Sequence, residues 1–327
     1  MAELRWHPLI KDWVMIASHR QNRPQMPKDW CPFCPGNGKV PDTYDVLKYD
    51  NDFPALSQNP PVPDAVESGI YKTAEAYGKC EVILYSPGHA TTLPALTDGH
   101  VRKLVDLWTD RFEEIAKDEK IKYIFIFENR GDAVGVTMPH PHGQIYGYSI
   151  IPKKIELELE SCFDYYDANE KCLICEMNDS EVGFGKRVIF ENEHFLVYLP
   201  FFTEYPYGVY ISSKRHASTM LEFSCAERDA LAIILKDTVG MFDSLFDIKF
   251  PYMMCMHQAP VNSGDYSKQY HFHIEFFPPL RSADKVKFNA SSETGAWAHC
   301  NTTAPEEKAE ELRHAYTRYL DIRRTNV

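Results

Sequence analysis

Hydrophobic residues recur at helical spacing in two long segments of the chain. In each segment the apolar positions lie three or four residues apart, which places them on one face of a helix. These positions are Val101, Leu104, Val105, Trp108, Phe112 and Ile115 in the first segment, and Leu231, Ile234, Leu235, Val239, Phe242 and Leu245 in the second. The pattern predicts two amphipathic helices, the first of which begins after Thr97, a residue type favoured as N-cap.

Short runs rich in β-forming residues surround each predicted helix. Runs 81–87 and 123–127 flank the first helix, and runs 207–213 and 250–256 flank the second. Strands grouped in this way around a helix predict an antiparallel sheet with its helices on one face. The proline-rich segment 54–64 predicts an extended surface loop.

The landmarks of the first half return in the second half in the same order. The matched pairs are CPFC 31–34 with CLIC 172–175, NDF 51–53 with NEHF 192–195, His89 with His216, and HPH 140–142 with HFH 271–273. Internal repetition of this kind indicates a duplicated unit. We therefore predict an α+β fold of two tandem pseudo-symmetric repeats, each with an antiparallel sheet and packed helices. The repeats are assigned to residues 1–160 and 161–327, with 151–171 as the linking region.

Charge and cysteine content narrow the class of function. The net charge of −12 argues against nucleic-acid and membrane partners, but local arginines can still hold a small anionic substrate. No apolar stretch has the length of a signal peptide or a membrane span. We expect a cytoplasmic protein, in which the nine cysteines are not expected to form disulfides.

The two CxxC pairs and the duplicated histidines predict two zinc sites. Structural zinc takes four Cys or His ligands in a tetrahedron. The predicted sets are Cys31, Cys34, His89 and His140 in the first repeat, and Cys172, Cys175, His216 and His271 in the second. The alternatives are buried free thiols, a zinc site kept in only one repeat, and a redox pair. We disfavour the redox pair because neither CxxC is expected to open a helix in a thioredoxin-like context.

The segment TMPHPHGQIYG at 137–147 carries the candidate chemistry. In an extended strand alternate side chains share a face, so His140, His142 and Gln144 would line one side. If His140 binds zinc, the neighbouring His142 can act as a nucleophile toward phosphorus through a neutral imidazole. Gln144 can then donate a hydrogen bond to a phosphoryl oxygen. The alternative is that all three side chains are zinc ligands or core polar groups.

The same segment resembles a known family. PHPHGQ, with the preceding Glu128-Asn129-Arg130-Gly131, closely resembles the galactose-1-phosphate uridylyltransferase branch of the histidine-triad superfamily. Weaker matches keep their order along the chain: HRQNRP at 19–24, NDFPAL at 51–56, YSPGHATTLPAL at 85–96, HQAP at 257–260 and FFPPLRSA at 276–283. The resemblance implies a histidine-triad-like fold and a ping-pong reaction. In it His142 attacks the α-phosphorus of UDP-glucose, and galactose 1-phosphate then takes the uridylyl group.

The resemblance also implies roles for further residues. Gln144 would steady the phosphoryl oxygens together with His142. The implied phosphate contacts are Arg20, Arg23, Asn129 and Thr137, and the implied uridine and ribose contacts are Asn51, Asp52 and Phe53. Lys287, Phe288 and Glu293 would reach the sugar and nucleotide from a partner subunit, so the resemblance implies a homodimer.

Two departures from the family pattern limit what the resemblance implies. The best-known bacterial enzymes hold an iron-type metal with one Glu and three His, for which this chain offers Glu158, His257, His273 and, in place of the last His, Glu275. We therefore favour a second zinc over iron. Where the family commonly has a glutamine for sugar recognition, this chain reads GAWAH at 295–299, which leaves the hexose open.

Three other functions are compatible with parts of this sequence. An adenylyltransferase of the ADP-glucose phosphorylase kind would use the same His142 chemistry, so the nucleobase stays open. A hydrolase of the small histidine-triad kind is disfavoured, because those enzymes have a third histidine where Gln144 stands. The non-enzyme alternative is a zinc-stabilised nucleotide-binding module, in which His142 would be structural.

Overall fold

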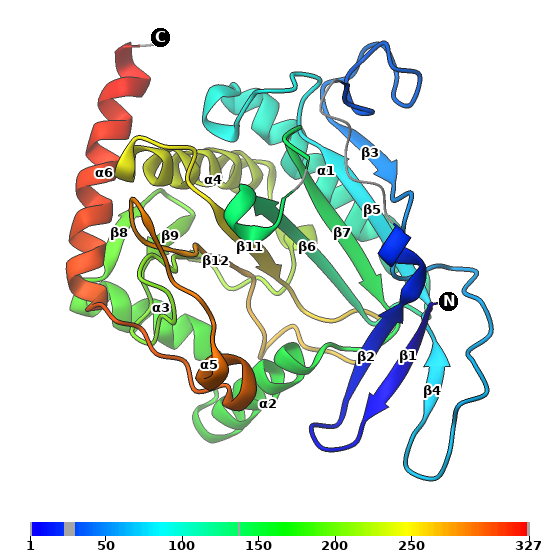
Figure 1. Ribbon diagram of the computed structural model, residues 1–327. Coiled ribbons are helices and arrows are strands. Elements are labelled where there is room, and N and C mark those ends of the chain that lie inside the picture. The colour runs from blue at the N-terminus through cyan, green and yellow to red at the C-terminus, as the bar shows by residue number, and fades with distance from the viewer. Residues whose placement is uncertain (1, 23–29, 137, 326–327) are drawn as a thin grey trace.

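A single antiparallel sheet organises the computed structural model, which describes residues 2–22, 30–136 and 138–325. Within these ranges nine strands pair in the order β3-β5-β7-β6-β11-β12-β10-β9-β8 (Figure 1). In that order the strands are β3 Leu47–Asp50, β5 Gly78–Leu84, β7 His142–Tyr148, β6 Tyr123–Arg130, β11 Tyr252–His257, β12 His273–Phe277, β10 Tyr210–Ser213, β9 Phe195–Tyr198 and β8 Val188–Glu191.

The two halves of the chain meet in the middle of this sheet. Strand β6 of the first half pairs with β11 of the second, from Tyr252 opposite Arg130 to Met256 opposite Ile126. The inner strand β7 lies between β5 and β6, and its counterpart β12 lies between β10 and β11. The α+β fold with two pseudo-symmetric repeats is therefore confirmed, but the two predicted sheets are joined into one.

Three long helices cover one face of the sheet. They are α1 Asp98–Ala116, α4 Cys225–Phe246 and α6 Pro305–Thr325. The side chain of Thr97 accepts a hydrogen bond from the backbone nitrogen of His100, as its N-cap role requires. All twelve apolar positions that predicted the first two helices are buried, and they form the main core with the sheet. Both helix predictions are confirmed.

The linking region contains a helix that the sequence analysis missed. Helix α2 Lys153–Asn169 packs on the opposite face of the sheet, where Ile155 and Leu159 bury against Tyr123 and Tyr270. Two shorter helices, α3 Leu173–Phe184 and α5 Ser291–Ala296, follow in the second half. The expectation that helices occupy only one face is therefore wrong. We call the face on which α2 packs the open face, because the three long helices α1, α4 and α6 all lie on the other face.

A small sheet at the N-terminus was also missed. Strand β1 Ala2–His7 pairs with β2 Asp12–Ala17 and β4 Thr73–Glu75, and its Leu4 packs in one cluster with Cys80 and Tyr146 of the large sheet. The predicted loop 54–64 forms neither a helix nor a regular strand, as expected. The remaining elements are β13 Leu280–Ser282, β14 Lys285–Val286 and the 3-10 turns Ser18–Asn22, Leu93–Ala95, Asp132–Val134 and Met220–Glu222.

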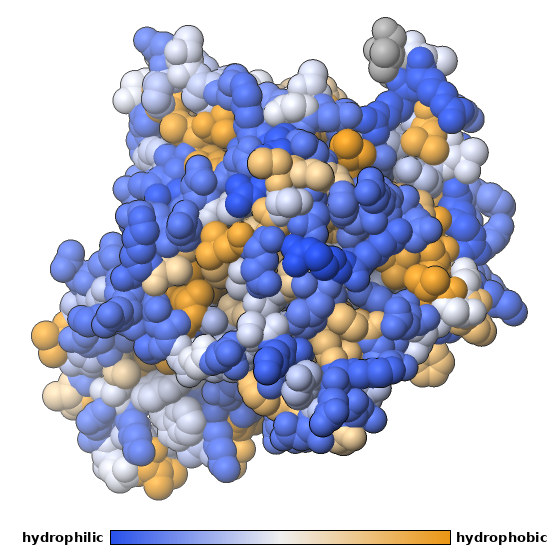
Figure 2. Space-filling model, turned by 180° about the vertical axis from the view of Figure 1, so that it is seen from behind, coloured by the Kyte–Doolittle hydropathy of each residue, from blue (hydrophilic) through white to orange (hydrophobic). Residues whose placement is uncertain are grey.

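Polar side chains dominate the surface seen from behind the view of Figure 1. Figure 2 shows apolar side chains there in several small groups rather than one continuous area. Among the described residues, none of the helices combines the length and the apolar character that crossing a membrane requires.

The contact between α4 and α6 leaves no room for a side chain at Gly240. A Cβ atom there would lie 2.1 Å from a ring carbon of the buried Tyr319. We predict that Gly240→Ala lowers the free energy of unfolding by about 2 kcal/mol through overpacking, measured by urea unfolding. Gly183→Ala is the control, because open space surrounds that exposed helical glycine. Equal stability of Gly240→Ala and wild type would contradict this packing.

Candidate active site

Strand β7 places the candidate catalytic side chains on the open face. Ile145 points into the core beneath the helices, so its neighbours in the alternation, Gln144 and Tyr146, point the other way. His142 lies two residues before Gln144 and shares its face. Gln144 lies opposite Phe127 of β6, whose strand also carries Asn129 on this face. The prediction that His142 and Gln144 share a face is confirmed.

His140 does not belong to the strand. It lies in a bend just before β7 and is fully buried, so the prediction of one continuous extended strand from 140 to 144 is wrong at its first residue. The Nε2 atom of His140 donates to the carbonyl oxygen of Ser86 over 2.8 Å, and its Nδ1 faces the sulfur of Cys31. Burial lowers the pKa of His140 to about 4, so its imidazole is neutral at physiological pH. The neutral ring is the form that binds a metal ion.

The backbone of His140 orients His142. Nδ1 of His142 lies 2.8 Å from the carbonyl oxygen of His140. Because a carbonyl oxygen only accepts, Nδ1 must carry the proton and donate it. The ring lone pair of the neutral tautomer is then on Nε2. His142 is half-buried at the edge of a cavity, in the orientation that a nucleophilic imidazole needs.

The first predicted ligand set comes together as expected. Cys31, Cys34, His89 and His140 offer ligand atoms that all lie within 4.8 Å of one another. Sγ of Cys34 lies 3.4 Å from Nδ1 of His89, and Sγ of Cys31 lies 3.7 Å from Nδ1 of His140. These four residues could hold a metal ion.

The second set forms a matching cluster. Sγ of Cys175 lies 3.5 Å from Nδ1 of His216 and 3.2 Å from Nδ1 of His271, and Cys172 completes the group. Cys172 is the N-cap of α3, but the element before it is helix α2 and not a strand, so this CxxC pair does not open a helix in a thioredoxin-like context. Its cysteines face two histidines, which is the arrangement of a metal site.

A cavity of about 400 Å³ lies where β6 and β7 meet the loop between them. His142 and Asn129 line it, together with two cationic residues, Arg130 and Lys249. Both terminal nitrogens of Arg130 donate to Asp243 over 2.8 Å, which fixes this buried guanidinium. Arg130 alternates with Asn129 along β6 and pairs with Asp243 of α4, so its guanidinium lies on the helix side of the sheet. The acidic residues Glu128 and Asp132 also line this cavity.

A buried carboxyl group lies behind the nucleophile strand. Glu128 accepts hydrogen bonds of 3.2 Å from the hydroxyl groups of Tyr85 and Tyr252. Burial raises its pKa to about 7, although Arg130 and both hydroxyls oppose the shift. The Tyr85 hydroxyl also lies against Gly143, where a Cβ atom would be 2.3 Å from its oxygen. The glycine between His142 and Gln144 is therefore required by close packing against Tyr85.

The second repeat has a different residue at the position equivalent to Gln144 of the candidate catalytic pair. Strand pairing places Gln144, Phe127, Cys255 and Glu275 in one row across four strands, with the seam between the two repeats in the middle. Glu275 is thus the counterpart of Gln144. Nδ1 of His273, the counterpart of His142, likewise lies 3.0 Å from the carbonyl oxygen of His271. A carboxylate in place of the amide would repel a phosphoryl group, so only the first repeat is suited to phosphate chemistry.

The residues implied for the nucleoside lie at the end of β3. The side-chain oxygen of Asn51 accepts from the backbone nitrogen of Phe53 over 2.9 Å, which forms a tight turn. Asp52 accepts from Nζ of Lys39 and from the hydroxyl of Tyr49, both over 2.9 Å. This turn lies beside β5 and does not line the cavity of His142.

The residues implied for the phosphates are only partly placed. Asn129 lines the cavity. Arg20 lies in the turn Ser18–Asn22, close enough to the thiol of Cys80 to influence it electrostatically. Arg23 and Thr137 lie outside the described residues.

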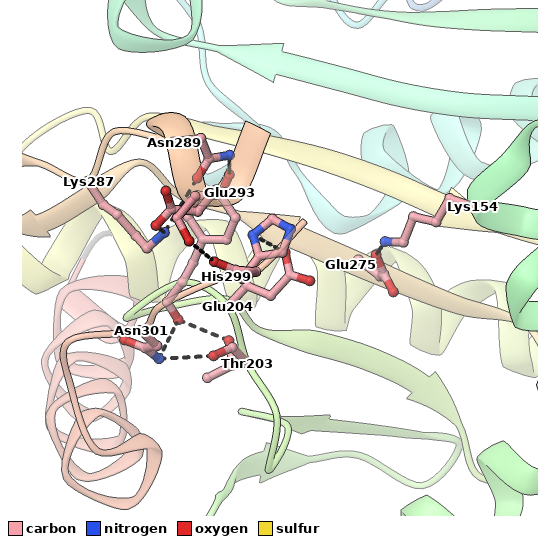
Figure 3. A network of polar contacts seen from close by, with 12 residues as sticks. Lys154, Thr203, Glu204, Glu275, Lys287, Asn289, Glu293, His299 and Asn301 are labelled. Carbon is pink, nitrogen blue, oxygen red and sulfur yellow. Dashed lines mark hydrogen bonds and ion pairs between the residues drawn. The ribbon is translucent and has the colours of Figure 1, made fainter. Parts of the chain in front are cut away.

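The C-terminal segment forms a strap along the second repeat. Residues 285–301 pack on the loop 203–205, where Nδ2 of Asn289 donates to the Tyr205 hydroxyl and Nδ2 of Asn301 donates to the Thr203 carbonyl (Figure 3). Nζ of Lys287 lies over the Tyr205 ring and 4.0 Å from Glu293. Phe288 is 77% exposed. Among the described residues, the lining of the His142 cavity includes none from this strap.

Several residues that line the cavity were not site candidates in the sequence analysis, among them Glu128, Arg130, Tyr85 and Lys249. Glu128 and Arg130 belong to the quoted ENRG segment, so their position beside Asn129 was an available signal. Tyr85 opens the quoted YSPGHATTLPAL segment, which was a similar signal, whereas Lys249 carries none, because the fold brings it to the cavity from a distant part of the chain.

The contact between Gly143 and Tyr85 can be tested by a double-mutant cycle. We predict that Gly143→Ala lowers kcat by about 100-fold, because the strand must shift away from the tyrosine hydroxyl and misplaces His142. Adding Tyr85→Phe removes the clashing oxygen and should restore part of the lost activity. Steady-state kinetics of the single and double variants measure both effects. Strictly additive losses would contradict the proposed contact.

Comparison with known proteins identifies the family. The N-terminal and C-terminal domain models of galactose-1-phosphate uridyl transferase match residues 1–152 and 158–321. The galactose-1-phosphate uridylyltransferase of Thermotoga maritima is 45% identical over 96% of this chain and 98% of its own length. A solved uridylyltransferase structure, 32% identical, superposes with a TM-score of 0.90 over 97% of this chain and 99% of that one.

A related structure shares the fold at lower similarity. The ADP-glucose phosphorylase of Arabidopsis thaliana, solved with ADP-glucose, is 24% identical with a TM-score of 0.74, covering 96% of this chain and 99% of its own. The resemblance carried by the HPHGQ segment is thus confirmed by matches along nearly the whole chain. The chain belongs to the galactose-1-phosphate uridylyltransferase family of nucleotidyltransferase enzymes.

Proposed function

We propose that this enzyme transfers the uridylyl group of UDP-glucose to galactose 1-phosphate through a uridylyl-histidine on His142. The observation that carries the proposal is the hydrogen bond from Nδ1 of His142 to the His140 carbonyl, which puts the ring proton on Nδ1 at the edge of a cavity that Asn129 also lines. The 45% identical relative is named for this transfer.

In the first half-reaction, Nε2 of His142 attacks the α-phosphorus. The bond between that phosphorus and the bridging oxygen breaks, and glucose 1-phosphate leaves with the electron pair. The imidazole gains positive charge as the new bond forms, and the His140 carbonyl stabilises it through the Nδ1 proton. In the second half-reaction a phosphate oxygen of galactose 1-phosphate attacks and Nε2 leaves. The acceptor is already an anion, so neither step needs a general base.

Gln144 supports both steps as a hydrogen-bond donor. The Tyr146 hydroxyl donates to the side-chain oxygen of Gln144 over 3.2 Å, which fixes the amide orientation. The amide NH₂ is then available for the phosphoryl oxygens in the transition state. Asn129, Thr137, Arg20 and Arg23 are proposed for the phosphates, and Asn51, Asp52 and Phe53 for uridine and ribose.

A homodimer would complete the active site. Lys287, Phe288 and Glu293 are proposed to contact the sugar and nucleotide of the partner subunit. The strap that carries them rests on its own repeat and exposes Phe288, which suits a segment that reaches outward. We further propose a cytoplasmic enzyme, in keeping with nine free cysteines, and a division into repeats 1–160 and 161–327.

Both Cys₂His₂ clusters are proposed to bind zinc as structural sites. With zinc–sulfur bonds of about 2.3 Å and zinc–nitrogen bonds of about 2.1 Å, a tetrahedron separates sulfur from nitrogen by about 3.6 Å. The measured separations of 3.2 to 3.9 Å bracket this value. The outer nitrogens of His140 and His271 each donate over 2.8 Å to a carbonyl, of Ser86 and Ser213, as zinc-binding histidines commonly do.

Removal of one thiol tests the zinc proposal. We predict that Cys31→Ser loses one zinc per chain and melts at a lower temperature, because metal binding contributes to folding. Cys225→Ser is the control, since this exposed cysteine lies outside both clusters. Zinc content by mass spectrometry and thermal unfolding are the measurements. Unchanged zinc and stability in Cys31→Ser would refute the ligand assignment.

Covalent labelling tests the catalytic proposal. We predict that UDP-glucose labelled in its α-phosphate leaves acid-labile, alkali-stable label on wild type, and that His142→Gly retains none. Turnover of His142→Gly should fall by on the order of 10⁴-fold or more, because no other group supplies the nucleophile. His273→Gly, at the equivalent place in the second repeat, should still be labelled.

A substrate panel separates the nucleobase and acceptor alternatives. If the protein retains label from ADP-glucose in preference to UDP-glucose, the result would favour the adenylyltransferase function. Absence of label with every nucleotide sugar would favour the zinc-stabilised binding module. Both results would contradict uridylyl transfer.

A further inference from the structure

A second polar cluster lies on the open face, in the repeat without the catalytic pair. Glu158 of α2, His257 of β11 and His273 of β12 offer ligand atoms within 4.8 Å of one another. Glu275 adds a carboxylate, with its oxygens 3.5 Å from Nε2 of both His257 and His273. Two imidazoles and two carboxylates are a donor set that divalent metal ions accept.

A lysine, however, already supplies a positive charge to this cluster. Lys154 lies one helical turn before Glu158 on α2, so both side chains point the same way. Its Nζ lies 2.5 Å from an oxygen of Glu275 and 3.7 Å from an oxygen of Glu158 (Figure 3 shows the contact with Glu275). The ammonium group thus bridges the two carboxylates that a metal ion would have to bring together.

Hydrogen bonds satisfy the rest of the cluster. Glu158 accepts from the Tyr270 hydroxyl over 2.7 Å and lies 2.9 Å from Nδ1 of His257. The Tyr210 hydroxyl donates to the other oxygen of Glu275. Glu275 and His257 are both 2% exposed, so an uncompensated charge there would be costly. With Lys154 present, every carboxylate oxygen has a donor or a cation without any metal ion.

We propose that Lys154 takes the place of a metal ion in the Glu158–His257–His273–Glu275 cluster, so that this site needs no metal. A divalent ion at the centre would lie within a few ångströms of the ammonium, and the two positive charges would repel each other. The donor set alone fits a metal, but the donor set together with Lys154 does not. The proposal does not depend on the identity of the transferred nucleotide.

The consequence is that removing the lysine should create a metal site. We predict that Lys154→Met binds one Mn²⁺ per chain at least about tenfold more tightly than wild type, because the repulsion is gone and the carboxylates lack their cation. Titration with MnCl₂, following free Mn²⁺ by electron paramagnetic resonance, measures this independently of activity. The Cys₂His₂ clusters are not expected to bind Mn²⁺, because thiolate ligands select other metals.

Two further variants make the test specific. Lys153→Met is the matched control, because Lys153 pairs with Glu156 and does not contact the cluster. It should behave as wild type. Adding Glu275→Gln to Lys154→Met should abolish the new Mn²⁺ binding. Two results would overturn the proposal. One is that wild type binds Mn²⁺ as tightly as Lys154→Met and loses this binding when Glu275→Gln is introduced. The other is that Lys154→Met folds but binds Mn²⁺ no more tightly than wild type.

Discussion

The hydrogen bond between His142 and the carbonyl oxygen of His140 is the contact on which the active site depends. It fixes the proton on Nδ1 and thereby the lone pair on Nε2. The carbonyl can hold this position because the His140 ring is anchored among Cys31, Cys34 and His89 and by Ser86. A metal at that cluster would therefore act on the chemistry indirectly, by holding the backbone that orients the nucleophile. His140 therefore belongs to both proposals, because its ring is a proposed zinc ligand and its backbone carbonyl orients His142.

Duplication gave the fold two such arrangements, and one difference between them determines where chemistry can occur. His273 is oriented by His271 just as His142 is by His140, and both pairs adjoin a Cys₂His₂ cluster. The residue two positions further along is a neutral amide in the first repeat, Gln144, and a carboxylate in the second, Glu275. The amide can donate to a phosphoryl oxygen, whereas the carboxylate repels it and recruits Lys154 instead. The second repeat thus keeps the architecture but lacks the amide that the proposed chemistry uses.

Features that depend on local pattern were predictable from the sequence, and features that depend on distant packing were not. Periodicity predicted α1 and α4, and paired motifs predicted both Cys₂His₂ clusters. Helix α2 was missed because its polar, acidic sequence resembles a linker, and its buried face became clear only against the sheet. His140 leaves the strand because its burial beside Cys31 overrides the extended pattern. Lys249 belongs to no motif in the sequence, and only the fold brings it to the cavity.

The role of His142 as the nucleophile is tested most directly by measuring which of its ring nitrogens carries the proton. Nitrogen-15 NMR of histidine-labelled protein distinguishes a protonated ring nitrogen from one that carries a lone pair. We predict that His142 carries its proton on Nδ1 before reaction and that adding UDP-glucose attaches phosphorus to Nε2. A proton on Nε2 in the resting enzyme, or phosphorus on Nδ1 after reaction, would contradict this prediction.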